Sequence, residues 1–180
     1  MEIEILSENG FDQAMYGLSL SYNSDLSRMP ARARVLSDMD DGHNKFLESM
    51  QIWVRIKAPR YFWSEFDTYR VGVSKQSEST MHTLNRRELT QSDFEYTLPE
   101  GILSSFNTLL KNSAPLEVLK NALPEGFLQE RVVNLNYKVV RHIIKQRSKH
   151  KLPQWLQFCR YMLKNLKYAE YLGFSPVDEV

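Results

Sequence analysis

The sequence lacks the features that mark disulfide-bonded, zinc-binding, membrane-spanning and secreted proteins. Its only cysteine is Cys159, which excludes an intrachain disulfide, and no Cys/His cluster has the spacing of a zinc site. No stretch approaches the roughly 18 uninterrupted apolar residues of a membrane span. The N-terminal MEIEILSENG lacks the apolar run of a signal peptide. We therefore expect a cytoplasmic protein with no metal site and no membrane partner.

Neither sign of charge dominates the chain. Its 23 basic and 22 acidic residues give a net charge of +1, which provides no global field to attract nucleic acid. A nucleic-acid partner is therefore not expected, and any such role needs a local basic patch. Only seven glycines and seven prolines occur among 180 residues, which argues against a long linker. Length and composition predict a single domain over residues 1–180.

Hydrophobic periodicity predicts several elements in the first part of the chain. Glu2–Leu6 alternates like a short strand, and Phe11–Tyr22 has apolar residues at helical spacing. Residues 28–34 form a polar connector that contains Pro30, and Asp40-Asp41-Gly42 is typical of the entry to a helix that continues through Met50. Gln51–Ala58 is expected to be a half-buried strand, because alternate residues are aliphatic.

The second part of the chain is more helical. Pro59 is expected to open a helix over residues 60–69, and residues 71–98 are expected to form a long loop or a set of turns. Gly101–Lys111 and Pro115–Asn121 indicate short helices, although the latter also fits a turn. Two further helices are predicted over Glu125–Ser148 and from Pro153 to Leu166.

Two separated segments together carry a family resemblance. The first contains Gly42-His43 with the following Glu48, then the strand, then a helix that ends in Asp67-Thr68-Tyr69-Arg70, then the serine-rich Ser74–Ser79. The second contains Val133-Asn134-Leu135-Asn136-Tyr137-Lys138 and, further on, Lys145-Gln146-Arg147. In order and content these segments resemble the flavin-dependent thymidylate synthases. Pattern and resemblance together predict an α/β (α+β) fold with a central, mostly antiparallel sheet flanked by long helices.

The resemblance implies a function and a set of site residues. Members of the family are homotetramers that bind FAD between subunits, and they methylate dUMP with methylenetetrahydrofolate while NADPH re-reduces the flavin. By resemblance, Ser77 and Arg147 are expected to be catalytic. The expected cofactor contacts are His43, Glu48, Tyr69, Arg70, Asn136 and Lys138. The expected contacts with a pyrimidine deoxynucleotide are Glu65, Gln76, Ser77, Ser79 and Arg147.

The chain also departs from the family pattern. Thr68-Tyr69-Arg70 stands where the family has Arg-His-Arg, and Ser77 follows Arg70 after six intervening residues where the family has seven. Glu65 stands in place of a glutamine and Ser79 in place of an arginine that helps to hold the nucleotide phosphate. Three hypotheses follow: an active thymidylate synthase, a flavoenzyme with a changed substrate, or a non-catalytic scaffold.

Several of these residues also fit ordinary structural roles. His43 is compatible with a first-turn histidine, and Glu48 with a solvated helix glutamate. The aromatic stretch within residues 53–69 fits a core or subunit interface as well as a platform for a flavin or base. The basic cluster within residues 141–151 fits a phosphate site of a neighbouring subunit, and equally a helix C-terminus whose cations complement the dipole.

Overall fold

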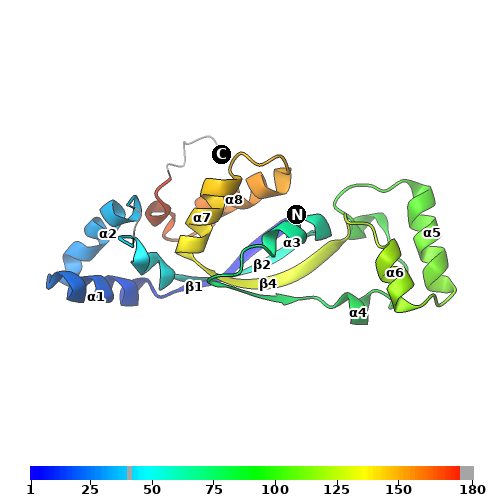
Figure 1. Cartoon of the computed structure of the whole chain (residues 1–180), viewed down its shortest axis with the longest axis horizontal. Coiled ribbons are helices and arrows are strands. Elements are labelled where there is room, and N and C mark those ends of the chain that lie inside the picture. The colour runs from blue at the N-terminus through cyan, green and yellow to red at the C-terminus, as the bar shows by residue number, and fades with distance from the viewer. Residues whose placement is uncertain (40–41, 175–180) are drawn as a thin grey trace. The chain divides into compact units, whose positions relative to one another are not determined.

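A four-stranded sheet organises the protein. The computed structural model describes residues 1–39 and 42–174, and its strands are ordered β1-β2-β4-β3. The strands are β1 (Glu2–Asn9), β2 (Gln51–Pro59), β3 (Val73–Ser77) and β4 (Leu128–Asn136). Arg55 lies 2.8 Å from Glu4 and Lys57 lies 3.8 Å from Glu2, which is the register of antiparallel neighbours. The antiparallel sheet predicted from the sequence is confirmed (Figure 1).

Helices fill the connections between the strands (Figure 1). The α-helices are α1 (Phe11–Tyr22), α2 (Met29–Ser37), α3 (Arg60–Phe66), α4 (Thr80–Thr83), α5 (Glu100–Lys111), α6 (Leu116–Ala122), α7 (Tyr137–Arg147) and α8 (Pro153–Asn165). The short 3-10 helices are η1 (Leu26–Arg28), η2 (Lys45–Glu48), η3 (Gln91–Asp93) and η4 (Ala169–Leu172). Within the described residues, none of the helices combines the length and the hydropathy that a bilayer crossing demands.

The chain divides into two compact units. Unit 1 comprises residues 1–2, 56–69 and 76–131, and unit 2 comprises residues 3–55, 70–75 and 132–180. Unit 1 contains α3, α4, α5 and α6, whereas unit 2 contains α1, α2, α7 and α8. The expectation of one domain over residues 1–180 stays a prediction.

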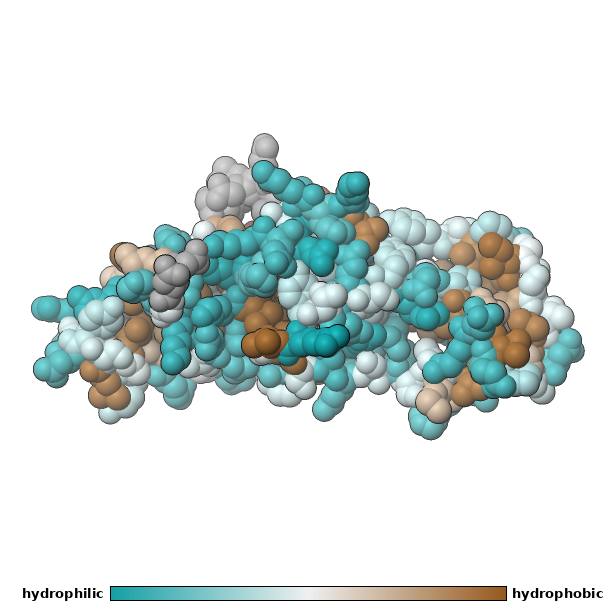
Figure 2. All heavy atoms as spheres, in the orientation of Figure 1, coloured by the Kyte–Doolittle hydropathy of each residue, from teal (hydrophilic) through white to brown (hydrophobic). Residues whose placement is uncertain are grey.

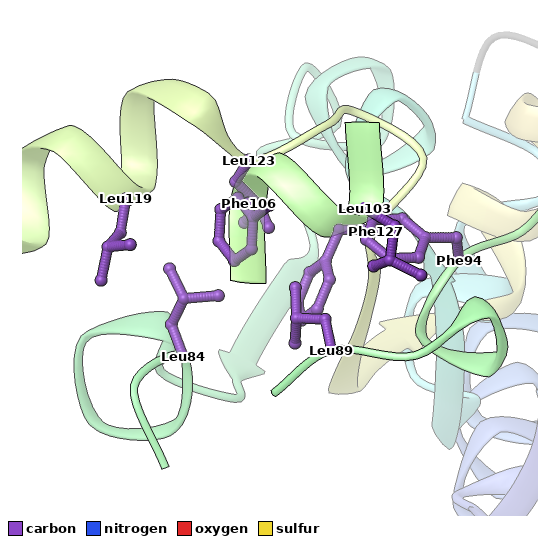
Figure 3. Close-up of a cluster of buried hydrophobic side chains, with 8 residues drawn as sticks. All are labelled: Leu84, Leu89, Phe94, Leu103, Phe106, Leu119, Leu123 and Phe127. Atoms are coloured by element: carbon purple, nitrogen blue, oxygen red, sulfur yellow. The ribbon is translucent and has the colours of Figure 1, made fainter. Parts of the chain in front are cut away.

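Unit 1 has a hydrophobic cluster of its own around α5 and α6 (Figure 3). Phe94 and Phe127 meet edge to face with ring centroids 5.9 Å apart, and a β-bridge joins their backbones. The buried members are Leu84, Leu89, Phe94, Leu103, Phe106, Leu119, Leu123 and Phe127. On the outside of the same helices, Ile102 and Val118 stay exposed, and Figure 2 shows hydrophobic atoms over this region.

Unit 2 buries α7 and α8 against one another and against η4. Trp155 and Phe158 of α8 and Val140 of α7 have no exposed surface, and burial of each such side chain stabilises the fold by about 1.5–3 kcal/mol. Tyr137, the first residue of α7, is also buried and donates its hydroxyl to the Glu8 carboxylate of β1. Glu8 in turn accepts the backbone N–H of Lys167 at 2.9 Å. These bonds fix the position at which α7 begins.

Several elements predicted from periodicity are confirmed. The helix over Phe11–Tyr22 has the predicted bounds, and the first strand extends three residues beyond Leu6. The strand from Gln51 is confirmed, with Ile52, Val54 and Ile56 fully buried. Helices at α3, α5, α6 and α8 are confirmed within a few residues, although α3 ends at Phe66 rather than at residue 69.

Four predictions about local structure are wrong. Glu125–Ser148 is not one helix, because residues 128–136 form β4 and only residues 137–147 are α-helical. Residues 28–34 are mostly in α2, in which Pro30 occupies a first-turn position that tolerates proline. The segment 71–98 contains β3, α4 and η3. Around residues 45–48 only a 3-10 turn forms, and the proposed entry at Asp40 and Asp41 lies outside the described residues.

Candidate functional site in two groups of polar residues

The start of α7 is the first group of predicted site residues, and it lies in unit 2. Asn136 caps the helix, since its side-chain oxygen accepts the backbone N–H of Val139 at 3.0 Å. Asn136 is 8% exposed. Its amide faces Gly72, where an added Cβ would lie 2.8 Å from Asn136 Nδ2. The turn that follows Arg70 therefore packs directly on the helix cap.

At position 72 the backbone conformation requires glycine. Its φ of 68° lies in the left-handed region, which is costly for residues with a Cβ. An added Cβ would also lie 3.1 Å from Val139 Cγ2. Arg70 and Val71, which precede Gly72, are exposed, so the guanidinium of Arg70 is available at this end of α7. The structure thus places two predicted cofactor residues, Arg70 and Asn136, on adjoining segments.

Lys138 and Glu48 form an ion pair beside this cap. Lys138 Nζ lies 2.6 Å from Glu48 Oε1, and the two side chains are 37% and 47% exposed. The pair joins η2 to the first turn of α7. Because each charge has an opposite partner, an anionic group that binds Lys138 must compete with Glu48. The structure brings these two predicted residues together, and their roles remain predictions.

An open pocket of about 770 Å³ lies next to the pair. One wall is α1, with Gln13, Gly17 and Ser21, and the other wall includes His43 and Glu48. A Cβ on Gly17 would meet nothing within 4 Å, so this glycine leaves open space. The volume suits a small molecule or part of a cofactor, for which pockets of roughly 300–1,000 Å³ are usual. The pocket gathers two of the predicted cofactor residues.

The second group of predicted residues lies in unit 1. Tyr69 is only 9% exposed, and its ring meets the ring of Phe66 edge to face at 6.0 Å. Glu65 is partly exposed on α3, and its carbonyl accepts the Thr68 hydroxyl at 2.7 Å. Gln76 and Ser77, at the end of β3, are exposed. Ser79 is partly exposed and is the N-cap residue directly before α4.

Arg131 is a residue that the sequence reasoning missed. Its guanidinium donates to both oxygens of Asp67, at 2.8 and 3.0 Å, and lies 4.4 Å above the ring of Trp63. It also donates to Gln129 Oε1 at 3.0 Å. Gln129 donates in turn to the carbonyl of Glu78 at 2.9 Å. This network ties the residue before Thr68 to the residue between Ser77 and Ser79.

Arg147 lies apart from the other predicted residues of unit 2. It ends α7, whose 11 residues span about 16 Å, so it is a helix length away from Asn136. Its guanidinium lies 4.7 Å above the ring of Trp155. Burial raises the pKa of the neighbouring Cys159 thiol to about 12, although the positive charge of Arg147 acts to lower it. The structure therefore does not bring Arg147 and Asn136 of one chain into a common site.

The polar groups present suit anions better than metal ions. Among residues 1–39 and 42–174, no three His, Cys, Asp or Glu side chains form a group that could hold a metal. The start of α7 offers a positive dipole end, with Lys138 in the first turn, although the backbone N–H groups of Tyr137 and Val139 already donate to the Met50 carbonyl and to the Asn136 side chain. That arrangement can bind a phosphate or pyrophosphate.

Known proteins resemble this chain over nearly its whole length. The family model described as thymidylate synthase complementing protein matches residues 12–168. No curated protein sequence matches the chain. Two crystal structures of the flavin-dependent thymidylate synthase ThyX from Helicobacter pylori, both with FAD and dUMP, have TM-scores of 0.81 and 0.82. Each is 16% identical and covers 97% of this chain and 98% of its own. The fold and the family match agree, and the chain belongs to the thymidylate synthase complementing protein family.

Proposed function

We propose that this protein binds FAD and dUMP and catalyses the reductive methylation of dUMP to dTMP. Methylenetetrahydrofolate would supply the carbon and NADPH the reducing equivalents, in a cytoplasmic homotetramer. The observation that carries the proposal is the start of α7, where the Gly72 turn places the Arg70 segment against the Asn136 cap, beside Lys138. By resemblance, flavin contacts are expected at these three polar residues.

The residues present fit a flavin dinucleotide. The pyrophosphate of FAD is anionic, and the start of α7 offers the positive end of the helix dipole and the cations Lys138 and Arg70. When bound, the flavin supplies hydride transfer, which no amino-acid side chain can perform. Lys138 would hold the pyrophosphate, for which it would have to give up its ion pair with Glu48. His43 and Glu48 line the pocket beside the helix start and restrict the position of the cofactor.

The nucleotide is held by hydroxyl, amide and guanidinium groups. Ser77 and Ser79 offer hydroxyls and Gln76 an amide on an exposed strand end. Arg147 is suited to the nucleotide phosphate, because its planar fork matches phosphate oxygens. Since α7 separates Arg147 from Asn136 by about 16 Å, a site that uses both needs Arg147 from a second copy of the chain. This requirement supports an assembly in which sites are shared between subunits.

Visible absorbance of the purified protein tests the proposal. After equilibration with FAD and removal of free flavin, we expect a stoichiometric flavin band, and dUMP-dependent reoxidation once the flavin is reduced. The variant Arg70→Met should retain less flavin, whereas the matched control Arg86→Met, an exposed arginine of unit 1, should retain as much as the wild type. Failure to hold flavin even in excess FAD would contradict the proposal.

The buried Tyr69 supports a second candidate function. Where the family has a histidine, this chain has a tyrosine packed on Phe66, and Glu65 adds a negative charge one turn earlier. The same scaffold would then act on a different substrate, or bind without catalysis. Complementation of a thymidine auxotroph separates the candidates: growth supports the thymidylate synthase. Flavin binding without growth favours a changed substrate, and the absence of both favours a scaffold.

A further inference from the structure

One segment of the chain is far more basic than the net charge suggests. Residues 138–167 contain nine of the 23 Lys and Arg residues and none of the 22 Asp and Glu residues. The rest of the chain therefore carries fourteen basic and all 22 acidic residues. The basic segment comprises α7, α8 and the connection between them. Such segregation creates a local positive field on a nearly neutral protein.

Some of these cations are used inside unit 2. Lys138 pairs with Glu48, and the buried Arg141 donates to the carbonyl of Leu172. Arg147 covers the ring of Trp155. The exposed members lie further along the segment, and they are Lys145, Lys149, Lys151, Arg160, Lys164 and Lys167. Hydrophilic side chains also dominate the visible surface over α7 (Figure 2).

A groove accompanies the cations along α8. Its volume is about 610 Å³, and its lining is Pro153, Leu156, Gln157, Arg160, Tyr161, Lys164 and Asn165. We call this the α8 groove. Residues 157, 160, 161 and 164 are spaced by three and four, so they share one helix face. Lys151 lies just before the first residue of α8 and extends the line of positive charge.

We infer that the α8 groove binds single-stranded nucleic acid. Arg160, Lys164 and Lys151 supply cations for the phosphates, and Tyr161 and Leu156, both partly exposed, supply an apolar surface for bases. Gln157 and Asn165 offer amide groups that can bond to base edges. A cationic line beside an aromatic ring is the usual chemistry of grooves for single strands. The 13 residues of α8 span about 20 Å, which accommodates a few nucleotides of a single strand.

The same observations disfavour two other polyanions. A duplex keeps its bases stacked inside, so it cannot use the apolar surface of Leu156 and Tyr161. A membrane would need large apolar side chains that project far enough to insert between lipids, whereas Leu156 and Tyr161 are only partly exposed. None of the large hydrophobic side chains found exposed among the described residues belongs to α7 or α8. The groove therefore fits a flexible single strand best.

Fluorescence anisotropy with a labelled oligothymidine of about 12 nucleotides tests the inference. Saturating FAD and dUMP are present, so that the site of the proposed enzyme does not contribute. We expect binding that weakens with salt, with a log–log slope of about −2 for three phosphate contacts. Tyr161→Ala should weaken binding by about fivefold to a hundredfold, because a stacked base is lost.

The double variant Arg160→Gln/Lys164→Gln should weaken binding and reduce the salt slope by about 1.4. Its matched control, Arg86→Gln/Lys120→Gln, removes the same charge from exposed positions of unit 1 and should bind like the wild type. Circular dichroism melts check that each variant folds. The inference holds whether or not the proposed synthase activity does, since neither the probe nor the readout involves it.

Three outcomes would overturn the inference. The first is equal loss of affinity in the double variant and its control, which would indicate a net-charge effect without a site. The second is tighter binding to a duplex, or to vesicles of anionic phosphatidylglycerol, than to the single strand. The third is no change of anisotropy at low salt.

Discussion

The two units fasten their predicted site residues with different kinds of bond. In unit 2, the start of α7 is held by a neutral phenol, because Tyr137 donates to Glu8 and Asn136 caps the helix. In unit 1, the end of α3 is held by a charged pair, because Arg131 donates to both oxygens of Asp67. We call the bonds of Tyr137 and Asn136 the neutral fastening and the bonds of Arg131 to Asp67 the charged fastening. The neutral fastening depends on the proton of the Tyr137 hydroxyl, which alkali removes. The charged fastening depends on a guanidinium that stays charged throughout the accessible pH range.

The two units differ in how closely their predicted site residues follow the family pattern. The neutral fastening of unit 2 positions Asn136, Lys138 and the Arg70 turn, which match the family. The charged fastening of unit 1 lies beside Thr68 and Tyr69, where the chain departs from the family. Arg131 does not simply replace the arginine missing at position 68, since Asp67 already neutralises its charge. A phosphate in that region would have to compete with a carboxylate that holds two hydrogen bonds.

Alkaline pH should break the neutral fastening first, with the largest effect. Burial, together with the Glu8 carboxylate, raises the pKa of Tyr137, and burial raises that of Cys159 from 9.0 to about 12. A group with a raised folded pKa stabilises the fold below its unfolded pKa and loses that contribution as pH rises. The free energy of unfolding should therefore fall from about pH 9 upward, by about 1.4 kcal/mol per pH unit for each group that titrates.

Urea unfolding followed by circular dichroism between about pH 8 and 11 measures this slope. The double variant Tyr137→Phe/Cys159→Ala should flatten it. The matched variant in unit 1 is Tyr61→Phe, which removes a tyrosine whose pKa burial and Glu95 raise to about 12. Because Tyr61 is only partly buried, its removal should change the slope less. An unchanged slope in the double variant would show that Tyr137 and Cys159 are not the groups whose titration destabilises the fold.

Removing Arg131 should break the charged fastening. Arg131→Met keeps an apolar stem over Trp63 but removes the guanidinium that donates to Asp67, whose side chain is 47% exposed and can be rehydrated, so we expect a loss of about 1–2 kcal/mol in unfolding free energy. Arg55→Met is the matched control, because Arg55 pairs with Glu4 while 33% and 55% of the two side chains are exposed. That pair should contribute less than about 1 kcal/mol. Equal losses in the two variants would show that Arg131 is an ordinary surface cation.

Much of the fold and part of the site could be predicted from the sequence. Period-two burial of Ile52, Val54 and Ile56, and the prolines at the starts of α3 and α8, depend on local chemistry that a sequence displays directly. The grouping of Glu48 with Lys138, 90 positions later, came from the family resemblance alone. No local pattern specifies a contact at that separation.

The largest error had a physical cause. Val132, Leu135 and Val139 are spaced by three and four, which favours a helix, yet Val133 and Leu135 are fully buried with Asn134 pointing to the other face. Pairing with β2 and β3 in the sheet overrides the helical spacing, and Asn134 Nδ2 also bonds to the carbonyl of Ile52 in β2 at 3.2 Å. The same error hid Arg131 and Gln129, since only a strand presents them on one face together. A prediction of a strand over residues 128–136 would have placed Arg131 and Gln129 on one face.

Substitution of Gly72 should disturb the neutral fastening without touching its hydrogen bonds. In Gly72→Ala, a φ of 68° and a Cβ 2.8 Å from Asn136 Nδ2 should cost about 1–3 kcal/mol of unfolding free energy and reduce flavin retention. Gly42→Ala is the matched control, because Gly42 has a φ of 90° but open space around an added Cβ. The control should show the backbone cost alone. If both variants lose equal stability and keep equal flavin, the contact of Gly72 with Asn136 does not position the Arg70 turn.

Substitutions of Asn136 should have the smallest effect on stability. They separate its role as a helix cap from its proposed role as a cofactor contact. Asn136→Ala removes the acceptor for the Val139 N–H, which should cost about 1 kcal/mol, as measured by urea unfolding. Asn136→Asp keeps a good cap and adds a negative charge at the helix start, so stability should be retained. If the proposed flavin pyrophosphate lies at this helix start, the new carboxylate should repel it, and the aspartate variant should lose flavin while staying as stable as the wild type. Retention of flavin in Asn136→Asp would place the cofactor elsewhere, because a carboxylate and a pyrophosphate cannot share one helix N-terminus without a loss of affinity.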